Sequence, residues 1–324
     1  MRRDIPPLVE VRRITQKKRD AWWTVLLVDP VATPLVRFVA RRTRITPNQI
    51  TWGALILGLV AAACFVKGDW YWLIAGALLY HLSFILDCMD GKVARLTGQG
   101  SVFGAWLDYI FDRIRVMACA VALMAGQYYR TGEMIYVWLA AVVVFLDGLR
   151  YINSLEIFKT RHTMRKQIKS RIRSARRDEN QAELAFMEDL LRDNPEADID
   201  HDATSAAAQE EAPSAPVTLA ASRGQVIDLQ QEFRHRFPGY LRFRSFMLRH
   251  RIRTHLISGI EFQMSVFIIG PLLDQIIGAT IISAALLLVF ELAIVYKLLL
   301  STRDFTRTMN SFEQQQQQNV TTAA

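Results

Sequence analysis

Four aspartates fall in two short stretches, where two apolar segments meet the edge of a bilayer. They are Asp87, Asp90, Asp108 and Asp112. The first pair is spaced i, i+3 and the second i, i+4, so each pair shares one face of a helix. Charges at this depth are expensive and are usually kept for function. Because clustered carboxylates repel one another unless hard divalent cations bind them, the spacing predicts a two-metal centre for Mg2+ or Mn2+.

Such a centre has a definite chemistry, because two metal ions clamp phosphate oxygens and stabilise both the attacking and the leaving group of a displacement. The predicted substrate therefore contains a pyrophosphate or a phosphodiester. Gly91, Ala94 and Gly104 leave room for a phosphate or nucleotide beside the acids. Arg95 adds a planar cation that suits phosphate. A solvated helix end explains one such acid, but not the whole set in so short a stretch.

Six apolar segments of membrane-spanning length position these residues. They lie near 50–66, 70–87, 104–126, 133–153, 255–273 and 279–300. Lysine and arginine concentrate before the first segment and after the fourth, whereas the opposite connections are short. The positive-inside rule then places both termini and the aspartates in the cytoplasm. We expect an all-α, multi-pass protein of the cell membrane with six transmembrane helices.

These spans divide the chain into five parts. The parts are a cytoplasmic amino-terminal and juxtamembrane segment (1–48), helices one to four (49–153), a large cytoplasmic insert (154–253), helices five and six (254–300) and a cytoplasmic tail (301–324). Residues 21–38 predict an amphipathic helix that either lies on the leaflet or packs against the membrane domain. The insert is basic at 159–177, predicts an acidic helix at 178–194 and predicts disorder at 195–224. It turns basic and aromatic again from 225, typical of a helix that grazes the membrane.

Other polar residues fall inside the spans. They are His81, Asp147, Arg150, Glu261 and Glu291. We expect all of them to face the protein interior, where interhelical pairing is the ordinary explanation. Arg150 is placed either to reach a phosphate on an acceptor or to pair with a neighbouring acid.

Composition narrows the class of protein further. The chain is 51% hydrophobic with a formal charge of +8, which suits a membrane protein with cationic faces toward anionic lipid. Several runs of membrane length argue against a nucleic-acid-binding protein. Cys64, Cys88 and Cys119 are too scattered to predict a disulfide framework or a thiolate metal site.

One run of residues resembles the full signature of the CDP-alcohol phosphatidyltransferase family. The matching positions are Asp87, Asp90, Gly91, Ala94, Arg95, Gly104, Asp108 and Asp112. The resemblance implies a six-helix membrane domain, a homodimer and one reaction. In that reaction a CDP-linked donor, usually CDP-diacylglycerol, gives its phosphatidyl group to an alcohol hydroxyl and releases CMP. It also implies that Asp112 is the general base, and we expect Asp87 and Asp108 to be shared metal ligands.

The segment Thr46–Thr51 is similar to a helix-opening segment of many family members, in which polar groups border the nucleotide. Asn48 and Thr51 are therefore candidates for the nucleotide pocket. A plain helix cap with Pro47 near its start explains the same residues equally well.

Two alternatives to this function remain at this level. A phosphotransferase that uses CDP-choline, CDP-ethanolamine or an inositol-type partner would carry the same motif, so the motif does not name the acceptor. A cation transporter would distribute its acids through the membrane depth, whereas here they gather at one interface.

Overall fold

The structure is a computed structural model that describes residues 5–179, 219–221, 225–227, 245–254 and 256–323. The chain forms two compact units. The first comprises Met1–Arg150 and Phe243–Glu291, and the second comprises Tyr151–Arg242 and Leu292–Ala324. All the predicted site residues belong to the first unit.

The amino-terminal part of the first unit is helical. It contains α1 (Leu8–Thr15), a π-helical turn η1 (Thr24–Val28) and α2 (Asp29–Arg42). Helix α1 packs against α2 and α4, and α2 also packs against α4. Ala32 and Val36 of α2 are buried, whereas Leu35 and Phe38 are exposed. The amphipathic segment thus packs on the membrane domain with one face and presents apolar side chains on the other.

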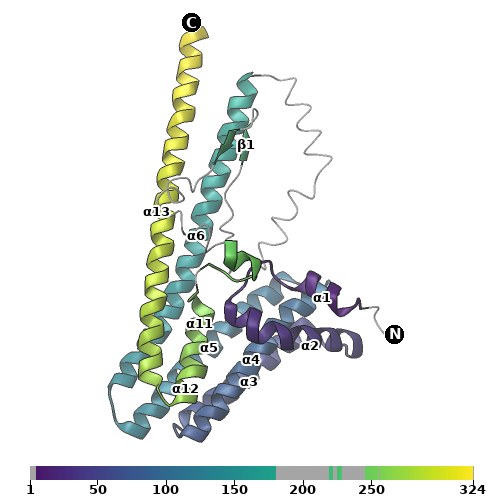
Figure 1. The fold of residues 1–324 in the computed structure, drawn as a ribbon, viewed down its shortest axis with the longest axis vertical. Helices are drawn as coiled ribbons and strands as arrows, with labels where there is room; N and C mark the ends of the chain where they lie inside the picture. The colour runs from purple at the N-terminus through teal and green to yellow at the C-terminus, as the bar shows by residue number, and fades with distance from the viewer. Residues whose placement is uncertain (1–4, 180–218, 222–224, 228–244, 255, 324) are drawn as a thin grey trace. The chain divides into compact units, whose positions relative to one another are not determined.

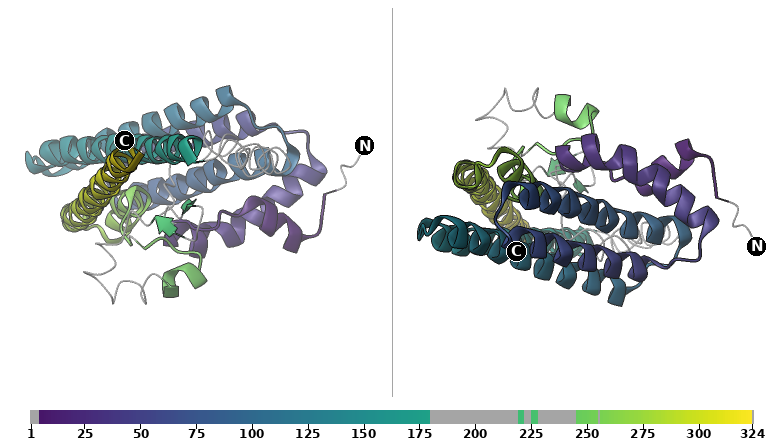
Figure 2. Two further views of the ribbon diagram at one scale, coloured as in Figure 1. Left: turned by 90° about the horizontal axis from the view of Figure 1, so that it is seen from above. Right: turned by 90° about the horizontal axis from the view of Figure 1, so that it is seen from below.

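Three long helices carry the predicted site residues, and Figure 2 shows them side by side. They are α3 (Pro47–Val66), α4 (Trp70–Thr97) and α5 (Val102–Thr131). Helix α3 packs along both α4 and α5. Helix α4 ends at Gly98, whose φ of 65° is a left-handed conformation that glycine adopts without strain. Helix α5 starts after Ser101, whose side chain accepts a hydrogen bond from the Gly104 amide.

The rest of the described chain is also largely helical (Figure 1). It contains α6 (Ile135–Glu179), α11 (Gly259–Met264), a second π-helical turn η2 (Ser265–Ile269), α12 (Gly270–Leu273) and α13 (Ile276–Ala323). Strands β1 (Leu219–Ala221) and β2 (Gln225–Ile227) form a short antiparallel pair, with Leu219 opposite Ile227. Strand β1 lies inside the stretch predicted to be disordered. Outside the described residues lie the rest of that stretch, residues 180–194 of the predicted acidic helix and residues 228–244.

Four helices in the described part of the chain are long and apolar enough to cross a membrane. They cover Pro47–Val66, Trp70–Thr97, Ile135–Ile172 and Ile276–Ser311. They match the predicted first, second, fourth and sixth spans, which makes this a membrane protein. The predicted third span lies in α5, which has 30 residues but charged groups along its first half. The predicted fifth span falls on the shorter apolar helix Gly259–Leu273.

Candidate functional site

The four aspartates lie on the two helix ends that meet at the Gly98 turn. Asp87 and Asp90 belong to the last turns of α4, and Asp108 and Asp112 belong to the first half of α5. Asp90 is buried and the other three are partly exposed. The charges of Asp87, Asp90 and Asp112 all act on Asp108. We call these four residues the acid cluster.

Two arginines that the motif does not contain engage the acid cluster. Arg115 Nη1 lies 3.2 Å from Asp87 Oδ1, and Arg115 Nη2 lies 2.5 Å from Asp112 Oδ1. Arg113 forms ion pairs with Asp112 and with Asp147 of α6. The predicted general base is therefore held by two guanidinium groups. Sequence reasoning missed both arginines, although their positions one and three residues after Asp112 could have indicated them.

Asp90 is held by neutral donors. The Thr51 hydroxyl of α3 donates a hydrogen bond of 2.6 Å to Asp90 Oδ2, and the Gly91 amide donates to Asp90 Oδ1. Thr51 is itself buried. Thr51, a predicted nucleotide-pocket residue, therefore orients the Asp90 carboxylate in the structure.

The small motif residues differ in what surrounds them. A Cβ atom at Gly91 would meet open space, so room exists beside Asp90. A Cβ atom at Gly104 would lie 2.8 Å from Asn48 Oδ1, so the starts of α3 and α5 approach closely there. Ala94 is partly buried on α4. Asn48 and Gly104, both predicted to border the nucleotide, are brought together.

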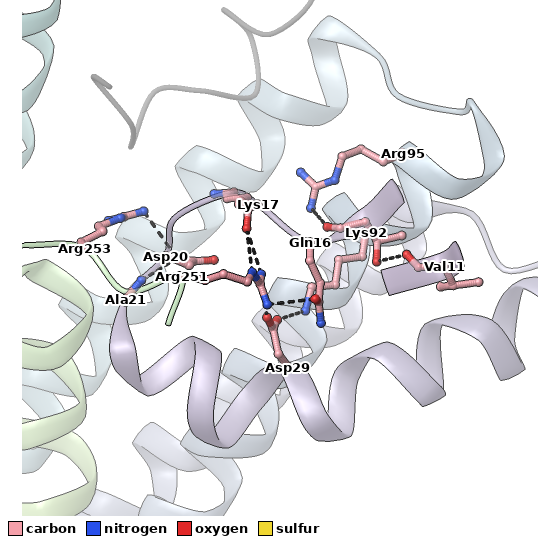
Figure 3. Close-up of polar contacts among 11 residues, drawn as sticks. Val11, Gln16, Lys17, Asp20, Ala21, Asp29, Lys92, Arg95, Arg251 and Arg253 are labelled. Carbon is pink, nitrogen blue, oxygen red and sulfur yellow. Dashed lines mark hydrogen bonds and ion pairs between the residues drawn. The ribbon is translucent and has the colours of Figure 1, made fainter. Parts of the chain in front are cut away.

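Arg95 faces a second polar cluster, drawn in Figure 3. Its Nη2 donates a hydrogen bond of 2.9 Å to the Thr15 carbonyl at the end of α1. Nearby, Asp29 forms a buried ion pair with Lys92 of α4, and Arg251 Nη2 lies 3.3 Å from Asp29 Oδ2. We call Asp29, Lys92 and Arg251 the Asp29 cluster. The structure thus gives Arg95, the predicted phosphate ligand, a backbone partner on the amino-terminal segment.

The Asp29 cluster continues into the backbone of the amino-terminal segment. Arg251 donates hydrogen bonds to the Lys17 carbonyl and to Gln16 Oε1. Asp20 forms an isolated parallel bridge with Ile252. The segment before α11 is therefore fastened to the segment before α2.

Interhelical pairing is observed for Asp147, Arg150 and Glu291, three of the five polar residues for which it was expected. Gln263 of α11 donates a hydrogen bond of 2.8 Å to Asp147 Oδ1. Arg150 Nε lies 3.5 Å from Glu291 Oε1, so the ion-pair alternative describes Arg150 here. Glu261 accepts hydrogen bonds from the amides of Ser258 and Trp22. The His81 ring lies edge-on to Trp23.

The acid cluster fits a divalent cation by the chemistry of its donors. All four side chains offer hard carboxylate oxygens, the ligand type that Mg2+ prefers. Asp108 forms no hydrogen bond or ion pair with any described residue, so its oxygens are available. The donors are not arranged as a finished cage, because no group of three or more acidic, histidine or cysteine side chains in the described chain is set to hold a metal ion. Instead, Arg115 forms ion pairs with carboxylate oxygens of Asp87 and Asp112.

Comparison with known proteins identifies the segment that contains this site. Residues 44–174 match the model of the CDP-alcohol phosphatidyltransferase family. The chain is 35% identical over 96 residues to a phosphatidylinositol phosphate synthase of Cutibacterium acnes, covering 29% of this chain and 42% of the relative. It is 32% identical over 117 residues to a CDP-diacylglycerol–inositol 3-phosphatidyltransferase of Arabidopsis thaliana, covering 36% and 48%. It is 40% identical over 86 residues to an archaetidylinositol phosphate synthase of Pyrococcus horikoshii, covering 26% and 44%. The chain thus spans less than half the length of each of these relatives.

Proposed function

We propose that this chain, which belongs through residues 44–174 to the CDP-alcohol phosphatidyltransferase family, transfers a phosphatidyl group from CDP-diacylglycerol to an alcohol hydroxyl and releases CMP. The observation that carries the proposal is the acid cluster. It combines the complete family spacing with a position on two helix ends that both pack against α3. Open space beside Gly91 gives a phosphate room to approach these acids.

Asp87, Asp90, Asp108 and Asp112 would hold two Mg2+ or Mn2+ ions. When bound, such ions neutralise charge on the diphosphate and on the departing CMP. Thr51 supports this role because its hydroxyl fixes the orientation of the buried Asp90 carboxylate.

Asp112 is the proposed general base. Its carboxylate takes the proton of the acceptor hydroxyl as the hydroxyl oxygen bonds to the phosphorus that bears the lipid. The bond from that phosphorus to the oxygen of CMP breaks in the same displacement. Arg113 and Arg115 favour the ionised carboxylate, which is the form that accepts a proton.

The nucleotide would lie beside the small residues of the motif. Gly91 on α4 leaves space, Ala94 contributes a small side chain on the same helix, and Gly104 lets α5 approach Asn48 on α3. Arg95 could reach a phosphate only by leaving the Thr15 carbonyl, so we propose a supporting role for it.

The acceptor we propose is an inositol-type alcohol, and inositol phosphate in particular. The names of all three relatives contain inositol, and two of them are named phosphatidylinositol phosphate synthase and archaetidylinositol phosphate synthase. The chain carries a formal net charge of +8, which is compatible with an anionic acceptor.

The proposed setting is a homodimer with six spans per chain. Helix α5 and the Gly259–Leu273 helix would supply the two spans beyond the four apolar ones. The predicted lysine and arginine bias would then place the acid cluster at the cytoplasmic face of the cell membrane.

The test is CMP release by the purified full-length protein in detergent. CDP-diacylglycerol and Mn2+ or Mg2+ are supplied with inositol phosphate, inositol, glycerol phosphate or serine. We expect release with inositol phosphate that Asp112→Asn abolishes and the matched control Asp69→Asn, in the turn between α3 and α4, does not. Release with another alcohol would overturn the acceptor, and no release with any alcohol would overturn the donor.

A further inference from the structure

Arg115 is the most deeply buried charge near the acid cluster. Its side chain is 1% exposed, yet it carries a full positive charge. It joins Asp87 on α4 to Asp112 on its own helix, so the first and last acids of the motif share one guanidinium group. Its Nη1 also donates a hydrogen bond of 3.3 Å to the Ser83 hydroxyl.

The bundle is shaped to admit this side chain. A Cβ atom at Gly58 of α3 would lie 2.6 Å from both Cγ and Cδ of Arg115, so only glycine leaves space for the arginine stem. The guanidinium carbon lies 5.9 Å from the centre of the Tyr80 ring, within the range of a cation–π contact. Residues on α3, α4 and α5 together surround the Arg115 side chain.

We propose that Arg115 is a counter-cation built into the acid cluster. It holds Asp87 and Asp112 at a fixed separation and competes with a divalent cation for their oxygens. This makes Arg115 a positioning residue, because it acts on metal and substrate through the two aspartates. The proposal rests on the proposed function, since it takes the acid cluster as the metal site.

A merely structural arginine and a counter-cation differ in how they respond to metal. Without Arg115, the carboxylates lose a compensating positive charge, which is costly in a buried site. A divalent cation can supply that charge. Loss of Arg115 should therefore cost stability mainly when metal is removed, and metal should stabilise the variant more than it stabilises the wild type.

The experiment measures the Tm of the full-length protein in detergent, in EDTA and in Mn2+. For Arg115→Gln we expect a Tm several degrees below wild type in EDTA, and a rise on adding Mn2+ about twice that of wild type. Arg115→Lys should recover part of the loss in EDTA, because it restores a charge without the planar fork. Lys92→Gln is the matched control: it removes a buried cation of the Asp29 cluster, and its loss should be equal in EDTA and Mn2+.

Mn2+ binding followed by electron paramagnetic resonance gives a second readout. We expect Arg115→Gln to bind Mn2+ several-fold more tightly than wild type, because a competing cation is gone. An equal loss of Tm in both conditions, or weaker Mn2+ binding, overturns the proposal. If Arg115→Gln does not fold in EDTA, Gly58→Ala displaces the arginine stem while retaining the charge and should show the same pattern to a smaller extent.

Failure of the proposed function and failure of the counter-cation proposal give different results. A wild-type protein whose Tm does not respond to Mn2+ or Mg2+ contradicts the metal dependence in the proposed function. A wild-type response that Arg115→Gln leaves unchanged overturns the counter-cation alone.

Discussion

The Asp29 cluster and the acid cluster both border the last turns of α4, but they balance charge in opposite ways. In the Asp29 cluster, one buried carboxylate meets two cations, Lys92 and Arg251. In the acid cluster, four carboxylates meet Arg115 and Arg113, and Arg113 is shared with Asp147. The first arrangement is complete within the chain. The second retains an excess of negative charge, which a divalent cation would neutralise.

The comparison separates two uses of buried charge. Lys92 lies within the family motif, only two residues after Asp90, yet it turns to the amino-terminal segment. A buried carboxylate whose charge is fully compensated in this way joins one segment to another. An unmatched group of acids in a membrane protein costs stability and is kept for binding or chemistry. Substitutions should therefore have metal-dependent effects in the acid cluster and metal-independent effects in the Asp29 cluster.

Asp87→Asn should have the largest effect, because Asp87 is a proposed metal ligand and a partner of Arg115. We expect loss of turnover together with weaker Mn2+ binding. Titration of activity and of the Mn2+ resonance signal over the same metal range measures both. Wild-type Mn2+ affinity in this variant would remove Asp87 from the set of ligands.

Asp112→Asn should abolish turnover with a smaller effect on the rest of the site. General-base catalysis contributes about 10²–10⁴-fold, so we expect a loss of that order in kcat. Donor binding, measured by protection of Tm with CDP-diacylglycerol, should persist. Normal turnover by the purified variant would contradict the assignment of Asp112 as the base.

Lys92→Gln tests the other side of the comparison. It leaves Asp29 buried with Arg251 as its remaining cation, so we expect a cost below the about 3–5 kcal/mol of unfolding free energy that an uncompensated buried charge incurs. We expect a lower Tm in EDTA and in Mn2+ alike, with kcat per folded molecule retained. The double variant Asp29→Asn/Lys92→Gln should lose less than the sum of the single variants. If Mn2+ restored the Tm of Lys92→Gln, the two clusters would behave as one metal-responsive site and the distinction between them would fail.

Hydropathy and motif spacing predicted much of this molecule, because both are local properties. Four of the expected spans match apolar helices, and the motif acids lie on consecutive helices. The extension of α4 to Thr97 was not predicted, since its last turns are too polar for a hydropathy signal.

Local sequence patterns could not predict the interaction partners of the site residues. Thr51 and Asp90 are 39 positions apart, and Lys92 and Asp29 are 63 apart. No periodicity within one helix specifies which side chain on another helix meets it. The surroundings of Arg115 illustrate the same point, because they combine Gly58 on α3 with acids on α4 and α5.

The smallest expected effect concerns Thr51, which supports the acid cluster without carrying charge. Thr51→Val keeps the shape of the side chain and removes the hydrogen bond of 2.6 Å to Asp90 Oδ2. A buried acceptor left without its donor costs about 1–3 kcal/mol, and part of that cost should appear as mobility of the Asp90 carboxylate. A bound cation would offset the missing donor, so we expect the activity of Thr51→Val to require more Mn2+ while kcat at saturating metal stays close to wild type. Thr51→Ser retains the hydroxyl and should restore the wild-type requirement. An unchanged metal requirement in Thr51→Val would assign Thr51 to packing of α3 on α4, and a raised KM for the CDP-linked donor would return it to the nucleotide pocket.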